Sequence, residues 1–278
     1  MAMVATAGLA ACAGYPEAEF RHDAVPQAVE ETPFHPQSRY QCGPAALLTL
    51  LDHSGVDTSM ASMVDRVYLP GREGSLQAEL VAATRAEGRL PYRIDPDLDA
   101  VAAELGEGRP VLVLQNLGVG WAPRWHYAVV YATDPAAGVV RLRSGTDPER
   151  TTRVAVFLRT WARSGFWGMV VLKPGELPAQ PDPARYVEAV AALEAAGQAA
   201  LALPYWRAAR ARWPEARMPL FALGNAALAA GRPHEAASIY RELLARHPGD
   251  AAARNNFAHA LAASGQLGAA LAELETAL

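Results

Sequence analysis

The stretch Phe34-His-Pro-Gln37-Ser-Arg-Tyr-Gln-Cys42-Gly-Pro44-Ala-Ala-Leu-Leu-Thr-Leu-Leu-Asp-His53 changes from an extended, proline-broken segment into an apolar helix. Pro44 suits the first turn of a helix, because the amide hydrogen that proline lacks has no helical partner there. Cys42 is therefore expected at or just before a helix N-terminus. Free backbone N–H groups and the helix dipole at that position favour a thiolate, which is the nucleophilic form of cysteine.

The residues around Cys42 bear on whether it is a nucleophile or a packed side chain. A buried structural role is the plain alternative, since free cysteine often behaves as a small hydrophobic residue. An upstream glutamine can add an amide donor for a developing oxyanion. Gln37 is the first candidate for that donor and Gln41 the second. The glutamine, the Cys-Gly pair and the helix start together favour a nucleophile.

The run from Gln37 through Cys42-Gly-Pro-Ala-Ala-Leu47 resembles the nucleophile segment of papain-like cysteine peptidases that process double-glycine leader peptides of bacteriocins. It is most similar to their stand-alone relatives without a transporter, and the resemblance spans residues 31–173. It implies an α+β papain-like peptidase domain. It also implies a glutamine in the oxyanion hole and a His and an Asp downstream of the cysteine. Selectivity for double glycine belongs to the transporter-linked members and is not implied here.

His126 is the best candidate for the base that a cysteine nucleophile needs. It opens a predicted strand after a glycine-containing loop, and Trp125-His126-Tyr127 resembles the histidine motif of the family. A surface histidine at a strand end is the alternative interpretation. His53 follows Cys42 on the same predicted helix at ~16 Å, too far for proton transfer. His35 is a weaker alternative.

The third member of the site is expected to orient the imidazole of His126. Asp134 lies ~26 Å along the strand from His126 and belongs to the far turn. A hairpin centred near Ala136 returns the chain so that about position 146 faces position 126, which makes Asp147 the first choice. The Asp-Pro pair of the family falls closer to Ser144, so Ser144 or a backbone carbonyl is the alternative.

Periodicity predicts helices first and then an antiparallel sheet, which is an α+β arrangement. The predicted helices cover residues 44–53, 59–68, 75–87, 97–105 and 157–164. The predicted strands cover residues 110–115, 125–132, 139–144 and 166–173. Together they place the peptidase-like domain at residues 34–173.

A proline-rich stretch at 174–183 predicts a semi-rigid linker, and the composition after it changes to Ala, Leu, Arg and Glu. Residues then recur with the 34-residue period of tetratricopeptide repeats. The recurring sets are Gly197, Gly231 and Gly265; Ala202, Ala236 and Ala270; Pro214 and Pro248; Trp206, Tyr240 and Leu274. Residues 184–278 are therefore expected to form an all-α domain of about three repeats, the last incomplete. An unrelated Ala-rich bundle is the alternative. Such repeats bind peptide segments or protein partners.

The N-terminal segment 1–11 is apolar and ends in Leu9-Ala-Ala-Cys12, which resembles a bacterial lipoprotein signal with Cys12 as the lipidated residue. No Lys or Arg precedes the apolar run, so an apolar tail is the alternative. Residues 12–33 are expected to be a tether. The lipoprotein interpretation places the protein in the cell envelope, anchored in the membrane at the periplasmic face of the outer membrane.

Composition limits the remaining function classes. The chain has 278 residues, is 51% hydrophobic, carries a net charge of −4 and contains two cysteines. Both charge signs are mixed, so no nucleic-acid partner is expected. Two cysteines are too few for a disulfide scaffold or a cysteine-based zinc site, and no HExxH pattern occurs. No cofactor or metal is expected.

The sequence thus predicts a cell-envelope cysteine peptidase that hydrolyses a peptide bond of a peptide or protein substrate, with repeats that bind a protein partner. A non-catalytic peptide-binding adaptor lipoprotein is the main alternative. Acyl or amide transfer by the same residues differs from hydrolysis only in the acceptor.

Overall fold

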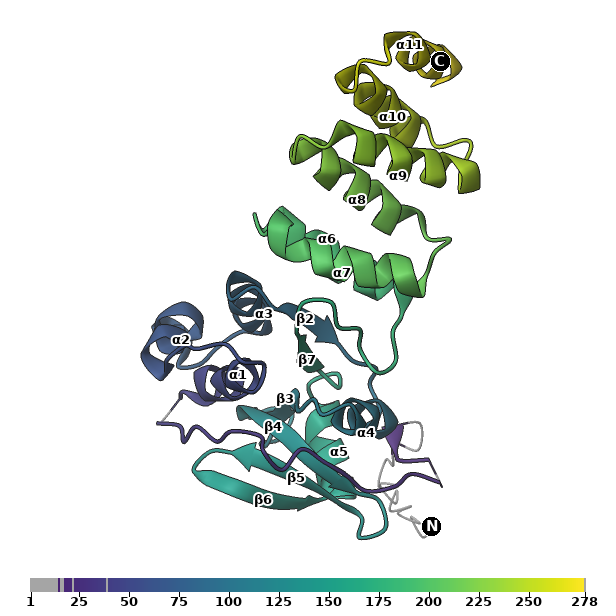
Figure 1. The fold of residues 1–278 in the computed structure, drawn as a ribbon. Helices are drawn as coiled ribbons and strands as arrows, with labels where there is room; N and C mark the ends of the chain where they lie inside the picture. Colours follow the sequence, from purple (N-terminus) through teal and green to yellow (C-terminus); the bar gives the residue numbers. More distant parts are fainter. Residues whose placement is uncertain (1–14, 16–17, 22, 39, 278) are drawn as a thin grey trace, which may run out of the picture.

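The computed structural model describes residues 15, 18–21, 23–38 and 40–277. The predicted lipidation site Cys12 and the segment 1–11 lie outside these residues. The described chain forms a sheet-containing first domain and a column of helices that rises from it (Figure 1).

One antiparallel sheet of seven strands forms the centre of the first domain, in the order β2-β7-β3-β4-β5-β6, with β1 paired to β4. The strands are β1 (Gln27–Ala28), β2 (Leu90–Arg93), β3 (Val111–Asn116), β4 (Trp125–Asp134), β5 (Val139–Ser144), β6 (Asp147–Arg153) and β7 (Gly168–Leu172). The predicted strands correspond to β3, β4, β5 and β7, whereas β1, β2 and β6 were not predicted.

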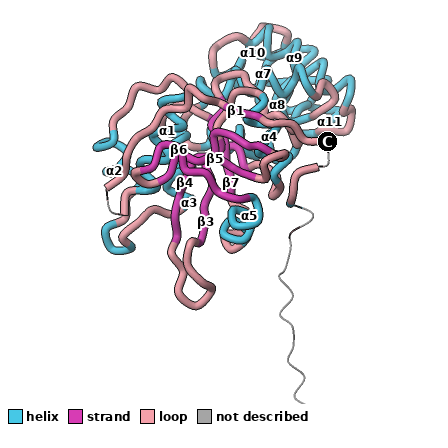
Figure 2. Tube along the Cα trace, turned by 90° about the horizontal axis from the view of Figure 1, so that it is seen from below, coloured by secondary structure: helices cyan, strands magenta, loops and turns pink. Residues whose placement is uncertain are grey.

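Helices cover both faces of this sheet (Figure 2). They are α1 (Cys42–His53), α2 (Met60–Val67), α3 (Gln77–Ala86), α4 (Leu98–Gly106) and α5 (Val154–Ala162), with a short 3-10 turn η2 (Pro70–Arg72) before α3. Alternate residues of a strand point to opposite faces. Leu112 and Leu114 therefore pack with α1–α3, while Val111 and Val113 pack with α4 and α5.

The segment expected to be a tether belongs in part to the fold. Ala18 and Val29 are buried in the core, and β1 pairs through Gln27 and Ala28 with the end of β4. The Arg143 guanidinium also donates hydrogen bonds to the backbone carbonyls of residues 30 and 32. A two-residue strand is held mainly by backbone pairing, so it leaves almost no pattern in the sequence.

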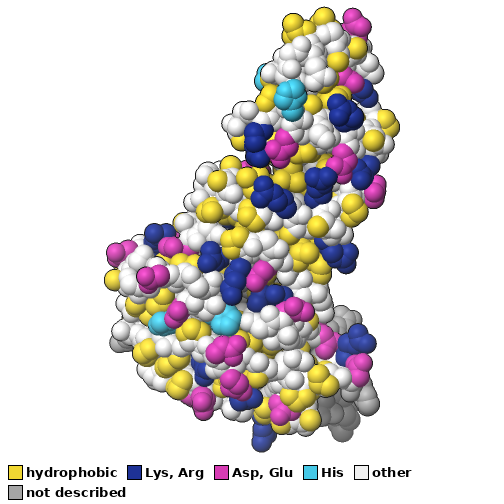
Figure 3. Space-filling view, viewed as in Figure 1, with side chains coloured by type: hydrophobic (Ala, Val, Ile, Leu, Met, Phe, Trp, Pro, Cys, Tyr) yellow, Lys and Arg dark blue, Asp and Glu magenta, His cyan; other side chains and the backbone are white. Residues whose placement is uncertain are grey.

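The C-terminal domain is all-helical, as predicted. Its helices are α6 (Pro183–Ala195), α7 (Ala199–Arg212), α8 (Arg217–Ala229), α9 (Pro233–Arg246), α10 (Ala251–Ala263) and α11 (Leu267–Ala277). Gly224 allows close helix packing, since a Cβ there would lie 2.6 Å from the buried Tyr240 ring. Charges of both signs are interspersed on the face seen in Figure 3, and ion pairs such as Arg217–Asp250 tie neighbouring helices together. None of the described helices is long and apolar enough to cross a membrane.

The proline-rich linker is fixed to the first domain by its backbone. The amide of Ala179 donates to Glu104 (2.9 Å), and the amide of Asp182 donates to the Tyr92 hydroxyl (3.1 Å). The Tyr205 hydroxyl of α7 donates to the carbonyl of Leu172 at the end of β7 (2.8 Å). One continuous apolar cluster includes the sheet and the repeat helices. The first pair of repeat helices is therefore packed directly on the first domain.

Candidate active site

The first helical residue of α1 is Cys42, and Gln41 stands at its N-cap position. The helix thus begins two residues before Pro44, where it was predicted to start. Tyr40 adopts a left-handed backbone conformation (φ 67°), which turns the chain into the helix. That conformation is costly for a residue with a side chain, so the surrounding structure must hold it in place.

Packing of α1 on the sheet sets the position of the Cys42 sulfur. Leu47 and Leu51 of α1 share a buried cluster with Leu112 of β3 and Val129 of β4. This contact brings the N-terminal end of α1 to the beginning of β4, where the backbone of Tyr127 acts to lower the pKa of the Cys42 thiol. Cys42 itself is only partly buried.

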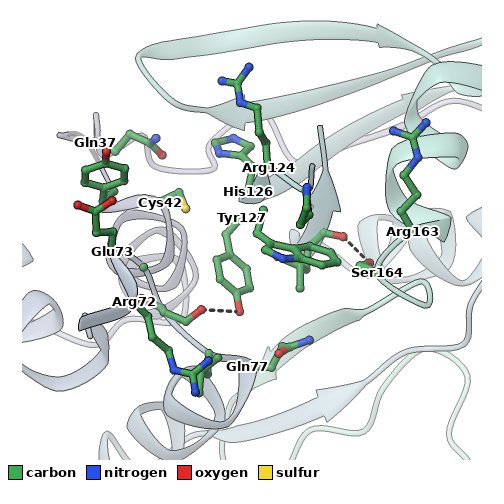
Figure 4. Close-up of a pocket in the computed structure, with 17 residues that line it drawn as sticks. Gln37, Cys42, Arg72, Glu73, Gln77, Arg124, His126, Tyr127, Arg163 and Ser164 are labelled. Carbon is green, nitrogen blue, oxygen red and sulfur yellow. Dashed lines mark hydrogen bonds between the residues drawn. The ribbon is translucent and has the colours of Figure 1, made fainter. Parts of the chain in front are cut away.

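Cys42 and His126 line one cavity of about 710 Å³. The Cys42 sulfur and the His126 ring point into the cavity from α1 and β4. The Gln37 side chain also lines the cavity, near Cys42 (Figure 4). The nucleophile and the base that the sequence suggests therefore share an open pocket. A structural cysteine sealed in the core does not fit this arrangement.

The His126 ring is held by Ser144, since Nε2 lies 2.8 Å from the Ser144 Oγ. Ser144 is the last residue of β5, the strand next to β4, and its side chain is buried. With Nε2 engaged, Nδ1 is the ring nitrogen left for a proton exchange with Cys42. Ser144, the alternative third member, is thus the candidate whose side chain contacts the His126 ring.

Asp147, the first choice for that position, begins β6 and pairs with Ser144 across the β5–β6 turn. Its exposed carboxylate accepts a hydrogen bond from the Glu149 backbone N–H (3.0 Å). Since β5 separates β6 from β4, Asp147 lies one strand further from His126 than Ser144 does, and neighbouring strands are about 4.8 Å apart.

Gln37 lines the cavity and is anchored by its own backbone N–H, which donates to the carbonyl of Gly145 (3.2 Å). Gln41 does not line the cavity. The other histidines that were weighed are engaged elsewhere: His35 contacts Asp52 at 2.9 Å, and His53 contacts the Gly108 carbonyl at 2.8 Å.

Burial dominates the electrostatics of the site. It raises the pKa of the Cys42 thiol, although the backbone N–H groups of Tyr127, Gly43 and Cys42 lower it in part. The sequence-based expectation of a thiolate at rest is therefore not met, because desolvation outweighs the helix start. Burial, together with the positive charges of Arg150 and Arg124, lowers the pKa of His126 to about 4. At neutral pH the resting pair is an uncharged thiol beside an uncharged imidazole.

Sequence reasoning missed Arg124 and Arg150. Arg124 lines the cavity directly before β4, and Arg150 acts on His126 from β6. The adjacency of Arg124 to the Trp125-His126 pair could have indicated the first. No sequence signal indicated the second, because β6 itself was not predicted.

Two family models of the tetratricopeptide repeat match the C-terminal part of the chain, one over residues 186–251 and the other over residues 227–278. Residues 186–278 are tetratricopeptide repeats. The repeats account for the all-helical column and confirm the period read from the sequence. No curated protein matches the chain in sequence.

Three solved structures are similar to the first domain. A protein described as a C39-like peptidase from Bacillus anthracis has a TM-score of 0.44 and 12% identity, over 54% of this chain and 98% of its own. A double glycine motif protease from an AMS/PCAT transporter, in complex with the leader peptide, has a TM-score of 0.39 and 16% identity, over 52% of this chain and 96% of its own. The peptidase domain of Streptococcus ComA, a bi-functional ABC transporter, has a TM-score of 0.40 and 16% identity, over 51% of this chain and 98% of its own.

The raised pKa of the Cys42 thiol predicts how alkylation depends on pH. Since the thiolate is the reactive form, the rate of modification by iodoacetamide should climb about tenfold per pH unit through pH 7 to 9. Mass spectrometry of the peptide that contains Cys42 would measure the rate, with free cysteine in the same buffers as the reference. A rate that is already level below pH 7 would contradict the burial effect.

Proposed function

We propose that the first domain is a cysteine peptidase that hydrolyses a peptide bond with Cys42 as nucleophile and His126 as general base and acid. The observation that carries the proposal is the shared cavity, which is lined by both Cys42, at the start of α1, and a His126 ring held by Ser144. Gln37 and the Cys42 backbone N–H are proposed as donors to the oxyanion.

The reaction uses the tautomer in which His126 Nε2–H donates to Ser144. Nδ1 takes the thiol proton as the sulfur of Cys42 attacks the substrate carbonyl and forms a C–S bond. The imidazolium then donates its proton to the departing amine as the C–N bond breaks. His126 then deprotonates a water that attacks the thioester. The C–S bond breaks, the carboxylic product leaves, and His126 returns the proton to the Cys42 sulfur. Because the resting pair is neutral, the proton moves during attack and not before it.

A non-catalytic peptide-binding adaptor is the second candidate, and the raised pKa of the Cys42 thiol favours it. An adaptor would keep the cavity and the repeats but would not need a reactive sulfur. Hydrolysis therefore has to be tested with variants of Cys42 itself.

Replacing the nucleophile should abolish turnover and leave the fold intact. Cys42→Ala removes only a partly buried sulfur, so we expect no cleavage of a peptide library and an unchanged circular dichroism spectrum. Mass spectrometry of the library before and after incubation measures cleavage. Cleavage by the variant would defeat the assignment of Cys42, and a wild-type protein that binds peptides without cleaving them would favour the adaptor.

Ser144 and Asp147 can be separated by paired substitutions. Ser144→Ala removes the hydrogen bond to His126 Nε2, so kcat/KM should fall about 3- to 10-fold, the worth of one neutral hydrogen bond. Asp147→Asn preserves shape and removes the charge, and its Oδ1 can still accept from the Glu149 N–H, so at this exposed position kcat/KM should change less than twofold. The opposite ranking of the two variants would make Asp147 the orienting residue.

The repeats are proposed to recruit a protein partner or the substrate, which the two repeat matches support. Cys12 is proposed as a lipid attachment site that anchors the protein at the periplasmic face of the outer membrane, on the sequence pattern alone.

The anchor has a direct test. In a bacterial host fed labelled palmitate, the wild-type chain should carry label and sediment with membranes, because attached acyl chains hold a protein at a bilayer. Cys12→Ser should lose both properties, whereas Cys42→Ala should keep them. A wild-type chain that carries no label would contradict lipidation at Cys12 and would favour the apolar-tail interpretation.

A further inference from the structure

The two charges that shift the pKa of His126 are both positive. Arg124 and Arg150 both disfavour a positive charge on the His126 ring, and no carboxylate in the described chain counteracts them there. Ser144, which holds the ring, is uncharged. The catalytic cycle nevertheless requires His126 to become an imidazolium, so the site lacks an anion at the point where positive charge develops.

Arg124 lines the cavity, whereas Arg150, on β6, is not among the residues that line it. Within the part of the chain that the structure describes, neither Arg124 nor Arg150 forms an ion pair with a carboxylate. The backbone at Arg124 is fixed, since its N–H donates to the Asn116 side chain (2.9 Å). Arg150 is fixed by strand pairing with Leu142.

Charges of both signs line the cavity. Glu73 lies across Cys42 from Arg124 in Figure 4, and Arg72, next to Glu73 in the chain, also lines the cavity. A third arginine of the lining, Arg163, donates to the carbonyls of Asn116 and Gly118. Because Arg72 offsets the charge of Glu73 and Arg163 is engaged, a carboxylate of a bound peptide is attracted most to Arg124. Guanidinium groups suit carboxylates because their planar donors match the two carboxylate oxygens.

The proposed mechanism identifies which part of the substrate lies next to His126 and Arg124. His126 donates its proton to the departing amine, so the part of the substrate that follows the scissile bond must lie along His126. We propose that Arg124 forms a carboxylate-binding subsite for the leaving-group side of the substrate, with Arg150 adding positive charge from β6. The inference rests on the proposed peptidase function and names its substrate class: peptides with a carboxylate after the scissile bond.

The bound carboxylate has a second effect. It sits beside Arg124 and partly neutralises its charge, so the imidazolium of His126 becomes easier to form when such a substrate is present. The substrate thereby supplies the negative charge that an acidic third member would supply. The carboxylate itself is not consumed in the reaction.

A matched pair of alkylating reagents, one charged and one neutral, tests whether the electrostatic potential at Cys42 is positive. The test does not require the substrate to be known. Iodoacetate and iodoacetamide both lose iodide to the Cys42 thiolate, but only iodoacetate carries a carboxylate. On the full-length protein at low ionic strength, we expect the ratio of the two rates to exceed that of free cysteine about tenfold and to fall as salt is added. Mass spectrometry of the peptide that contains Cys42 measures both rates.

Substitutions of single arginines show which residues raise the ratio of the iodoacetate rate to the iodoacetamide rate. Arg124→Gln and Arg150→Gln should each lower the rate ratio at least several-fold, and Arg124→Lys should retain most of it because the charge is kept. Arg159→Gln is the matched control, because Arg159 is exposed on α5 and does not line the cavity, and it should leave the ratio unchanged. A wild-type ratio equal to that of free cysteine, or one that ignores Arg124 and Arg150, overturns the subsite.

A binding experiment on Cys42→Ala identifies the source of the carboxylate. Peptides that carry Asp or Asn at successive positions, each with a free or an amidated C-terminus, should bind with a preference for the charged form, and Arg124→Gln should remove that preference. Preference for Asp indicates a side chain, and preference for the free terminus indicates the end of a chain. Equal binding of all forms overturns the subsite, whereas a Cys42 that neither reagent labels overturns the proposed peptidase and the subsite with it.

Discussion

Packing of α1 against β3 and β4 is the contact on which the site depends. Leu47 and Leu51 are fully buried against Leu112 and Val129, and burial of such side chains contributes about 1.5–3 kcal/mol each. A helix held by this much apolar surface cannot shift without a large loss of stability. The first residue of that helix is Cys42, so the same packing that stabilises the domain fixes the sulfur beside the start of β4.

The site shows a competition between burial and hydrogen bonding. Three backbone N–H groups favour a charged sulfur, yet desolvation of Cys42 prevails, and His126 is neutral for the same reason with two arginines adding to it. Ser144 orients the ring but cannot offset charge. The first domain thus places Cys42 and His126 on one cavity, with positive charge at His126 that no neighbouring carboxylate of the described residues offsets.

The junction between the domains restricts how the repeats present a partner. The Tyr205 hydroxyl is bonded to the end of β7, and the linker is bonded to Glu104 and Tyr92. The first repeat helices share one apolar cluster with the sheet. Because these contacts are buried and directional, the repeat array keeps a defined orientation to the cavity instead of swinging on a tether. A partner bound to the repeats is therefore delivered from one direction.

The sequence by itself determined the features that depend on local pattern: a helix start within two residues of Cys42, the strands β3, β4, β5 and β7, and the repeat period. It did not reveal β2, whose Pro91 is tolerated because β2 is an edge strand. Nor did it reveal β6, which is wholly polar and is held by backbone pairing. Only strand order shows that Ser144 contacts His126 while Asp147 does not, and that Arg150 acts on His126 from β6. Which side chains meet across neighbouring strands depends on register and twist, and those are set by the packing of the whole sheet.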